Sequence, residues 1–273
     1  MCPFCYLCTK AEKMDKKLAI IGAGNLATRV ALELHNKGVE IVQVYSRTVT
    51  SALTLARLLG CNYVTKTEKI TPEADIYLIS VSDMAMTELL ENVNFNNQLV
   101  VHTAGSIPMS ELKKFSKNYG VFYPLQTFSK FRDVNFTRIP FCIEANNKKN
   151  EETLMELAGL ISKDVRSITS EQRKQLHLAA VFVSNFTNHM YAIAGEIIQE
   201  KDLPFDILYP LIAETASKVK SMTPRAAQTG PAARNDKNII QEHLAMLNGK
   251  PKLKKLYNQI SESISEYHKL PKQ

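Results

Sequence analysis

The sequence lacks any apolar stretch of the ~18 residues that a membrane-spanning helix needs, and its run from Leu178 to Phe186 is interrupted by Ser184 and Asn185. The net charge is +7, but no dense basic run or aromatic-interleaved basic patch is present, which argues against a nucleic-acid-binding protein. There is no internal repeat or low-complexity segment, and 45% hydrophobic with 22% charged residues is typical of a folded globular chain. We expect a soluble, cytoplasmic protein that binds neither membranes nor nucleic acids.

Cysteines are also few, five in the whole chain. Three of them form a Cys-x-x-Cys-x-x-Cys pattern near the N-terminus: Cys2, Cys5 and Cys8. This spacing could hold zinc or an iron–sulfur cluster, but a fourth ligand is missing and Cys61 and Cys142 are isolated. Because Met14 directly precedes the first predicted strand, we predict that residues 1–14 are a disordered extension without metal. Whether these cysteines remain in the mature protein stays open, and no metal site is predicted.

A glycine-rich turn is the most informative feature that is present. The apolar run from Leu18 to Ile21 breaks into the segment Gly22, Ala23, Gly24, Asn25, Leu26 and Ala27, and a helical pattern follows. This Gly-x-Gly-x-x-Ala spacing is typical of a dinucleotide-binding turn, in which the first glycine makes the turn and the second lets the backbone approach a pyrophosphate. The phosphates would lie on free N–H groups at the start of the helix predicted over 26–37. An ordinary strand–turn–helix without a nucleotide is the alternative, but the second strand predicted over 39–45 favours the cofactor.

The end of that second strand indicates which nicotinamide cofactor is bound. NAD-selective sites place a carboxylate there for the ribose 2′-hydroxyl, whereas NADP sites often place an arginine for the 2′-phosphate. The strand ends in Ser46, Arg47 and Thr48, without a carboxylate. The guanidinium and the two hydroxyls suit a dianionic phosphate. NADP(H) is therefore the predicted cofactor, and a solvated loop arginine is the alternative.

Strands and helices alternate through the first half of the chain. Apolar runs predict strands over 74–81, 98–102, 120–123, 139–145 and 165–168, with helices over 51–59, 108–116 and 150–162 between them. This alternation predicts a doubly wound α/β sheet, mostly parallel, whose ligands bind beyond the carboxyl ends of its strands. The strand ends at Ser82 and Asp83, and at His102 to Ser106, are therefore candidate ligand contacts.

The pattern changes after residue 168. Thr169 or Ser170 can cap a helix, with Gln172 in its first turn, and nothing breaks that helix before Asp202. About 30 residues at 1.5 Å each give a rod of about 45 Å, which predicts the spine of an all-helical domain. Further helices are predicted over 205–222, 236–247 and 252–269. The predicted organisation is an NADP-binding domain over 15–168 and a helical domain over 169–273.

The long helix carries polar residues on an apolar rod. Its residues 176–183 are apolar nearly all round, which predicts that the helix is buried. His177, Ser184, Asn185 and Asn188 are spaced by two or three helical turns and so are predicted to share one face. They could face a substrate, or they could bond to neighbouring helices or to a partner subunit. The loop over 223–236 carries Arg225 and Arg234, which could hold an anionic substrate or a partner subunit.

The sequence also matches a known family at several motifs: Gly22 to Ala27, Val81 to Asp83, His102 to Ser106, Tyr123 to Phe128, His177 to Asn185, and Gly230 to Asp236 with His243 and Leu244. At these motifs the chain resembles Rossmann-like NADP-dependent oxidoreductases with a C-terminal domain of unknown function 2520, related to deazaflavin-dependent NADP oxidoreductases and pyrroline-5-carboxylate reductases. The resemblance covers nearly everything from residue 16 on. It implies dimerisation through the helical half, and it adds these cofactor contacts: Val81, Ser82, Asp83, His102, Thr103, Ala104 and Gly105.

These observations together predict an NADP(H)-dependent oxidoreductase that passes hydride to or from a small carbonyl or imine. Asn185 is the predicted substrate-orienting residue, and His177, His102 and Tyr123 are candidate proton donors, because the cofactor carries out the hydride step and the protein must supply a proton. Two alternatives stay open. One is a deazaflavin-linked NADP reductase, and the other is a non-catalytic protein that senses dinucleotides or assembles partners.

Overall fold

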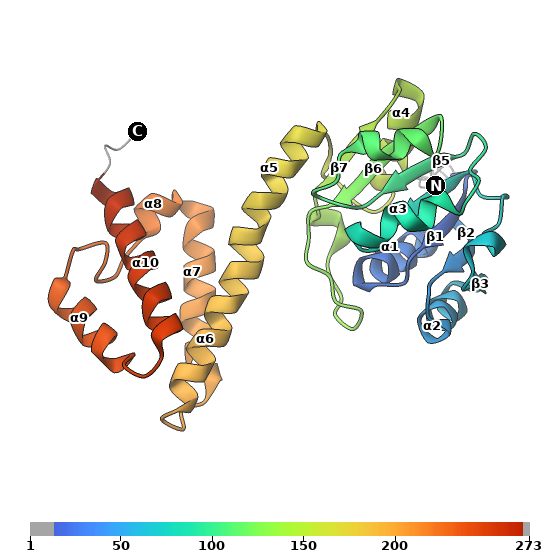
Figure 1. Ribbon diagram of the computed structural model, residues 1–273. Helices are drawn as coiled ribbons and strands as arrows, with labels where there is room; N and C mark the ends of the chain where they lie inside the picture. The colour runs from blue at the N-terminus through green and yellow to red at the C-terminus, as the bar shows by residue number, and fades with distance from the viewer. Residues whose placement is uncertain (1–13, 270–273) are drawn as a thin grey trace, which may run out of the picture. The chain divides into compact units, whose positions relative to one another are not determined.

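The structure is a computed structural model, and it describes residues 14–269 (Figure 1). The predicted N-terminal extension, with its three cysteines, therefore lies almost entirely outside the described residues. The chain divides into two compact units between His189 and Met190. That division falls inside the long helix, and the domain boundary predicted near residue 168 stays a prediction.

An eight-stranded sheet forms the centre of the first unit, in the order β3-β2-β1-β4-β5-β6-β7-β8. The strands are β1 (Lys17–Ile21), β2 (Glu40–Tyr45), β3 (Asn62–Val64), β4 (Ile76–Ile79), β5 (Leu99–His102), β6 (Asn118–Pro124), β7 (Phe141–Ala145) and β8 (Val165–Ser167). All neighbours pair in parallel except β6 and β7, which are antiparallel. The first six strands have the order typical of dinucleotide-binding folds, which confirms the predicted doubly wound sheet.

Helices cover both faces of this sheet: α1 (Asn25–Asn36), α2 (Val49–Leu59), α3 (Asp83–Glu91) and α4 (Lys148–Gly159). Because side chains alternate along a strand, Leu18 and Ile20 of β1 pack in a cluster with α1, α2 and α4, whereas Ala19 and Ile21 pack in a cluster with α3. Burial on both faces explains the continuous apolar runs in the central strands.

Two local predictions in this unit are corrected. The helix expected over 108–116 is a 3₁₀ helix, η2 (Met109–Lys114), and α3 was not predicted at all. Two further 3₁₀ turns are η1 (Thr67–Lys69) and η3 (Phe136–Arg138). These segments are short, so their sequences contain too few turns for a clear helical period.

The long helix consists of α5 (Ser170–Ala180), a π-helical segment η4 (Val181–Phe186) and α6 (Thr187–Gln199). Thr169 and Gln172 form the capping box that the sequence predicted. The predicted burial of this helix is wrong for the described chain, because Leu178, Phe182 and Val183 are 55%, 60% and 75% exposed. An apolar pattern indicates that a helix face is suited to burial, but it does not identify which part of the protein or which partner covers that face.

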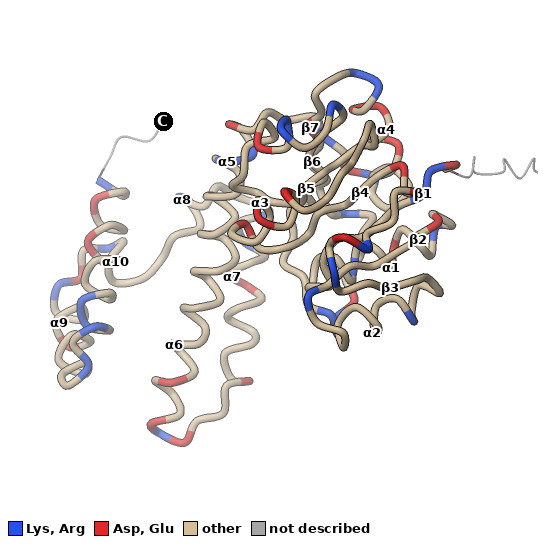
Figure 2. Tube along the Cα trace, turned by 45° about the vertical axis from the view of Figure 1, so that its right-hand side comes forward, with Lys and Arg blue, Asp and Glu red and all other residues tan. Residues whose placement is uncertain are grey.

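The second unit is all-helical over its described residues, as predicted. It contains the rest of α6 together with η5 (Phe205–Leu208), α7 (Tyr209–Ser221), α8 (Pro224–Ala227), α9 (Lys237–Met246) and α10 (Pro251–Lys269). Asp236 caps α9 by accepting a hydrogen bond from the backbone N–H of Ile239 at 3.3 Å. Figure 2 shows charged residues of both signs interspersed along α9 and α10 and an uncharged stretch over residues 175–195.

The described chain lacks two further features. None of its helices over residues 14–269 is long and apolar enough to cross a membrane. Within the same residues, no group of three or more His, Cys, Asp or Glu side chains is arranged to hold a metal ion.

Candidate active site

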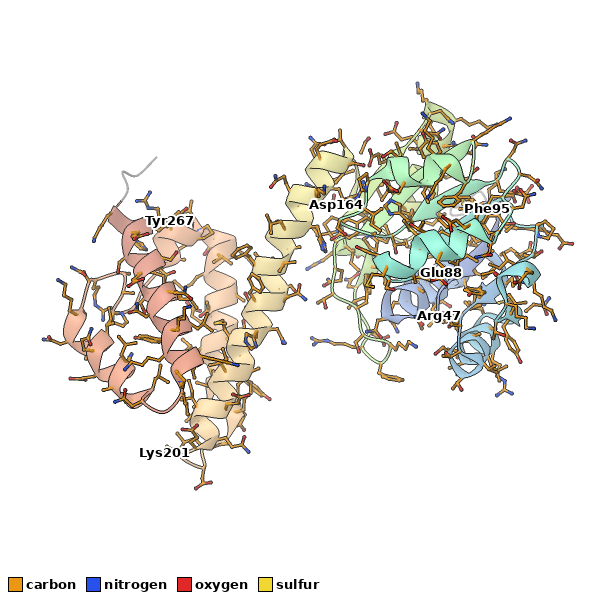
Figure 3. All side chains as sticks on the ribbon, viewed as in Figure 1. Arg47, Glu88, Phe95, Asp164, Lys201 and Tyr267 are labelled. Carbon is orange, nitrogen blue, oxygen red and sulfur yellow. The ribbon has the colours of Figure 1, made fainter. Side chains whose placement is uncertain are left out.

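A cavity of about 800 Å³ lies beyond the carboxyl ends of β1, β2, β4 and β5. All predicted cofactor contacts line it except Ala27, His102 and Gly105; those that line it are Gly22, Ala23, Gly24, Asn25, Leu26, Ser46, Arg47, Thr48, Val81, Ser82, Asp83, Thr103 and Ala104. Figure 3 labels Arg47 and Glu88, which both line this cavity. The sequence analysis missed other lining residues, among them Ser51, Glu88 and Lys130. No local pattern marks them, because they enter the cavity from the interiors of helices and from a distant loop.

The two glycines of the β1–α1 turn have different structural roles. Gly22 has a φ of +120°, and a Cβ there would lie 2.1 Å from the carbonyl oxygen of Ser80. Gly24 has a φ of −75°, and a Cβ there would meet no atom within 4 Å. The fold therefore requires a glycine at position 22, whereas Gly24 keeps space open in the cavity.

The start of α1 is suited to bind an anion. Its N-cap is Gly24, which has no side chain to accept a hydrogen bond from the first N–H groups. Such N–H groups, at the positive end of the helix dipole, attract phosphates. Ala27 lies behind this turn and is fully buried, with 0% of its surface exposed. It packs α1 on the sheet, as its small size predicts.

Arg47 is an exposed cation at the end of β2. It has no ion pair or hydrogen bond within residues 14–269. Across the cavity, Asp83 accepts a hydrogen bond of 2.6 Å from the hydroxyl of Ser106, which joins the loops after β4 and β5. The guanidinium of Arg47 is therefore available to a ligand, whereas the carboxylate of Asp83 holds the loop after β5.

Tyr123 and His177 form a hydrogen-bonded pair. The Tyr123 hydroxyl lies 3.1 Å from Nδ1 of His177, and the two rings meet edge to face. Burial raises the pKa of the Tyr123 phenol, with a smaller contribution from Cys142 and an opposing one from the Arg173 cation. The phenol therefore stays protonated at neutral pH, and it donates its O–H to Nδ1 of His177 or accepts from Nδ1–H according to the tautomer of the ring.

Gly105 connects this pair to the end of β5. A Cβ at Gly105 would lie 2.5 Å from Nδ1 of His177 and 2.6 Å from its Cγ, so the histidine ring packs directly on the glycine backbone. The two preceding residues, Thr103 and Ala104, line the cavity. The structure therefore brings two of the predicted proton donors together beside the β5 end of the cavity.

His102 has a different environment. It is 1% exposed, and its Nδ1 accepts a hydrogen bond of 3.2 Å from the backbone N–H of Ala104. Burial, and secondly the positive charge of Arg173, lower the pKa of His102 to about 4. The imidazole is therefore neutral at pH 7, which favours a role in shaping the turn after β5 over donation of a proton.

Asn185 lies apart from these residues. It is exposed on the π-helical segment, its side chain makes no hydrogen bond within residues 14–269, and it does not line the cavity. Because a π turn is wider than an α turn, the spacing that predicted a shared face for His177, Asn185 and Asn188 does not apply across residues 181–186. That shared face stays a prediction.

A buried ion pair that the sequence analysis missed holds the first turn of α5. Arg173 is 1% exposed, pairs with Glu144 of β7 and donates a hydrogen bond of 2.6 Å to the carbonyl oxygen of Ile107. Ser170 donates to the same carboxylate at 2.8 Å and accepts from the backbone N–H of Met109 at 3.0 Å. These bonds fix the helix that carries His177 to β7 and to the segment after β5. Because Arg173 and Glu144 are 29 residues apart, no local sequence pattern indicates that they pair.

The fold and the cavity define a Rossmann-type dinucleotide-binding protein. Residues 17–105 match the family described as NADP oxidoreductase coenzyme F420-dependent, and residues 139–264 match a domain of unknown function, DUF2520. A crystal structure of a candidate NADP oxidoreductase from Bacteroides fragilis is 49% identical, with a TM-score of 0.89, and the match covers 92% of this chain and 98% of that one. The chain therefore belongs to this family of nicotinamide-dinucleotide-dependent oxidoreductases, and the resemblance drawn from its motifs is confirmed.

More distant proteins share the fold. Pyrroline-5-carboxylate reductase from Streptococcus pyogenes is 12% identical with a TM-score of 0.62, and the match covers 92% of this chain and 98% of that one. Reductive aminase from Aspergillus terreus, solved with NADPH4, cyclohexanone and allyl amine, is 10% identical with a TM-score of 0.64, and the match covers 93% and 92% of the two chains. Glutamyl-tRNA reductase from Saccharolobus islandicus is 28% identical over 163 residues, 60% of this chain, which spans only 33% of that curated relative.

Proposed function

We propose that this protein is an NADP(H)-dependent oxidoreductase that transfers hydride between the nicotinamide ring and a small carbonyl or imine compound. The observation that carries the proposal is the Tyr123–His177 pair, whose histidine ring packs on Gly105 beside the β5 end of the cavity. A pair of proton-carrying groups at that end of a dinucleotide cavity supports a reduction that needs both a hydride and a proton.

The residues of the cavity support one orientation of the cofactor. The N–H groups at the start of α1 suit the pyrophosphate, and Arg47 suits the 2′-phosphate of the adenosine half. Val81 to Asp83 and Thr103 to Gly105, at the ends of β4 and β5, would then hold the nicotinamide half. The absence of a carboxylate after β2 and the unpaired guanidinium of Arg47 support NADP(H) over NAD(H).

The protein itself must supply the proton that the reaction needs. The bound cofactor supplies a hydride to the electrophilic carbon of the substrate. Tyr123 then donates its hydroxyl proton to the substrate oxygen or nitrogen. In the tautomer that carries its proton on Nδ1, His177 passes that proton to the phenolate through the 3.1 Å hydrogen bond, while its Nε2 takes up a proton from solvent. Arg173 and Glu144 keep α5 in place, and Asn185 is the residue that we expect to orient the substrate.

A hydride-transfer screen tests this function. The purified protein is mixed with NADPH and a panel of carbonyls, imines and deazaflavins, and loss of NADPH absorbance is followed. With an active substrate, Tyr123→Phe and His177→Gln should each lower turnover by about 10²–10⁴ while NADPH binding stays unchanged. Tyr119→Phe is the matched control, because it removes a hydroxyl from the same strand, and it should keep full turnover. Full turnover in the Tyr123 and His177 variants would overturn the assigned pair.

A deazaflavin-linked NADP reductase is the second candidate function. It is favoured by the match of residues 17–105 to a family described as coenzyme F420-dependent. Turnover with deazaflavins alone would favour this function over reduction of a small carbonyl or imine. Tight NADPH binding without transfer to any acceptor would favour a non-catalytic dinucleotide sensor.

A homodimer through the helical part completes the proposal. The support is the apolar face of the long helix, where Leu178, Phe182, Val183 and Phe186 are 49–75% exposed. The whole stretch 175–195 lacks charged residues. An apolar patch of this kind is typical of a protein interface, and a second copy of the chain would present the same patch to it, as in a two-fold symmetric dimer.

A further inference from the structure

The loop between β6 and η3 is held at both ends. The ring of Phe128 stacks on that of Phe136 with centroids 5.7 Å apart, and Phe136 is buried in the core. Further along, Asp133 accepts a hydrogen bond of 2.6 Å from Nη2 of Arg29, which belongs to α1. The segment Ser129–Lys130–Phe131–Arg132 therefore forms the apex of a loop that is tied to the helix whose start faces the cavity.

Lys130 differs from its neighbours on this apex. It lines the cavity together with the turn from Gly22 to Leu26 and is half-buried, whereas Ser129, Phe131 and Arg132 are exposed. Phe131 is 98% exposed, so the apex directs the lysine inward and the aromatic ring outward. Within residues 14–269, the Lys130 ammonium group has no ion pair and no hydrogen bond. Lys130 lies on a tethered loop, lines the cavity and has no carboxylate partner of its own. It is therefore suited to bind an anionic ligand.

Two acidic residues, Asp83 and Glu88, also line the cavity, and both belong to α3. Asp83 accepts a hydrogen bond from Ser106. The Lys130 loop is instead tied to α1 through Arg29, so its position corresponds to the side of the cavity where Gly24 leaves space open. Arg47, at the end of β2, is the other unpaired cation of this cavity.

We propose that Lys130 binds the pyrophosphate of the dinucleotide, and that the loop over residues 125–135 forms the outer wall of that phosphate site. The inference rests on the proposed function, because it concerns the same cofactor. Lys130 and Arg47 then have separate tasks. Lys130 contributes to the affinity for every nicotinamide dinucleotide, since all of them carry a pyrophosphate, whereas Arg47 selects the one with a 2′-phosphate.

Titration of NADPH and of NADH into the full chain tests these separate tasks of Lys130 and Arg47. Lys130→Ala should weaken NADPH and NADH alike, by about tenfold, because one charge-assisted contact is lost. Arg132→Ala is the matched control, since it removes a cation from the same loop that does not line the cavity, and it should bind both cofactors as the wild type does. Asp133→Ala, which removes the acceptor for Arg29, should weaken the binding of both cofactors by a smaller factor. The melting temperature without cofactor should be unchanged in all three variants.

Other outcomes overturn the inference in distinguishable ways. Wild-type affinity of Lys130→Ala for both cofactors removes Lys130 from the site and leaves the proposed function standing. A loss confined to NADPH assigns Lys130 to the 2′-phosphate and overturns the pyrophosphate contact. Equal losses in Lys130→Ala and Arg132→Ala indicate a general charge effect instead of a contact. A wild-type protein that binds neither cofactor overturns the proposed function itself.

Discussion

Arg47 is the residue on which the cofactor preference depends. Its guanidinium is exposed at the end of β2, lines the cavity and has no ion pair or hydrogen bond within residues 14–269. We predict that NADPH binds at least about tenfold more tightly than NADH, a difference of about 1.4 kcal/mol. Arg47→Ala should bring the two dissociation constants together, whereas Lys117→Ala, which removes an exposed cation elsewhere on the unit, should not. Calorimetric titration measures both, and equal wild-type affinities would contradict the prediction.

His102 gives the first unit an acid-sensitive residue. Its pKa is about 4 in the folded chain, against about 6.5 for an unperturbed histidine. Between these values the unfolded chain holds one more proton than the folded chain, so the free energy of unfolding falls as the pH drops through this window. The shift corresponds to about 3 kcal/mol at most. His102→Gln lacks this titration, and its unfolding free energy, measured by urea denaturation, should depend less on pH there. Parallel pH profiles for the two proteins would refute the argument.

A substitution at Asn185 can distinguish a role of this residue in function from a role in folding. Its amide is exposed and makes no hydrogen bond within residues 14–269, so its removal strands no buried polar group in the described chain. Asn185→Ala should therefore lose under about 1 kcal/mol of stability and bind NADPH normally, yet lose turnover once a substrate is known. Thermal melting without cofactor is the first measurement. A large fall in melting temperature would assign Asn185 to the structure and remove it from the predicted substrate site.

At the scale of elements, the β1–α1 turn predicts opposite effects for its two glycines. Gly22→Ala places a methyl group 2.1 Å from the Ser80 carbonyl oxygen at a φ of +120°, and strain of this kind destabilises a protein by roughly 1–3 kcal/mol or more. Gly24→Ala meets no atom and keeps an ordinary φ, so it should melt as the wild type does but bind NADPH more weakly. Melting and titration of both variants test this contrast. Comparable melting temperatures for the two variants would show that the turn can relax.

Whether the boundary of a helix could be predicted depends on how close in the sequence the interacting groups are. The capping box of Thr169 and Gln172 and the cap at Asp236 could be predicted, because each involves a side chain and a backbone group three residues apart. The π-helical segment over Val181–Phe186 could not be predicted in this way. Its sequence is apolar and compatible with an ordinary α-helix, so the wider turn depends on packing and not on residue type.

At the scale of the whole molecule, the exposed apolar face of the long helix predicts association. Burying one phenylalanine stabilises an interface by about 1.5–3 kcal/mol, so Phe182→Asp should weaken a dimer by about tenfold or more. Leu58→Asp is the matched control, because Leu58 is 58% exposed, close to the 60% of Phe182, but lies on α2. Sedimentation of the three proteins measures their oligomeric states. A monomeric wild type, or equal weakening by both substitutions, would contradict a dimer through this face.

The sequence by itself determined the alternation of strands and helices except for α3 and the 3₁₀ segment η2, together with the dinucleotide turn and the family, because these depend on residues that are close in the chain. Apolar runs, glycines and caps act over a few residues, and their spacing is visible without a structure. The sequence could propose Tyr123, His177 and His102 as proton donors, but it could not rank them.

Only the tertiary structure decided which of these residues act together. Tyr123 and His177 are 54 positions apart and meet because β6 and the start of α5 pack on the loop after β5. The same packing surrounds His102 with protein and leaves it neutral at pH 7, since burial disfavours a charge by an amount that no local pattern contains. Lys130 lines the cavity for a similar reason, because Arg29 and Asp133, 104 positions apart, tie its loop to α1.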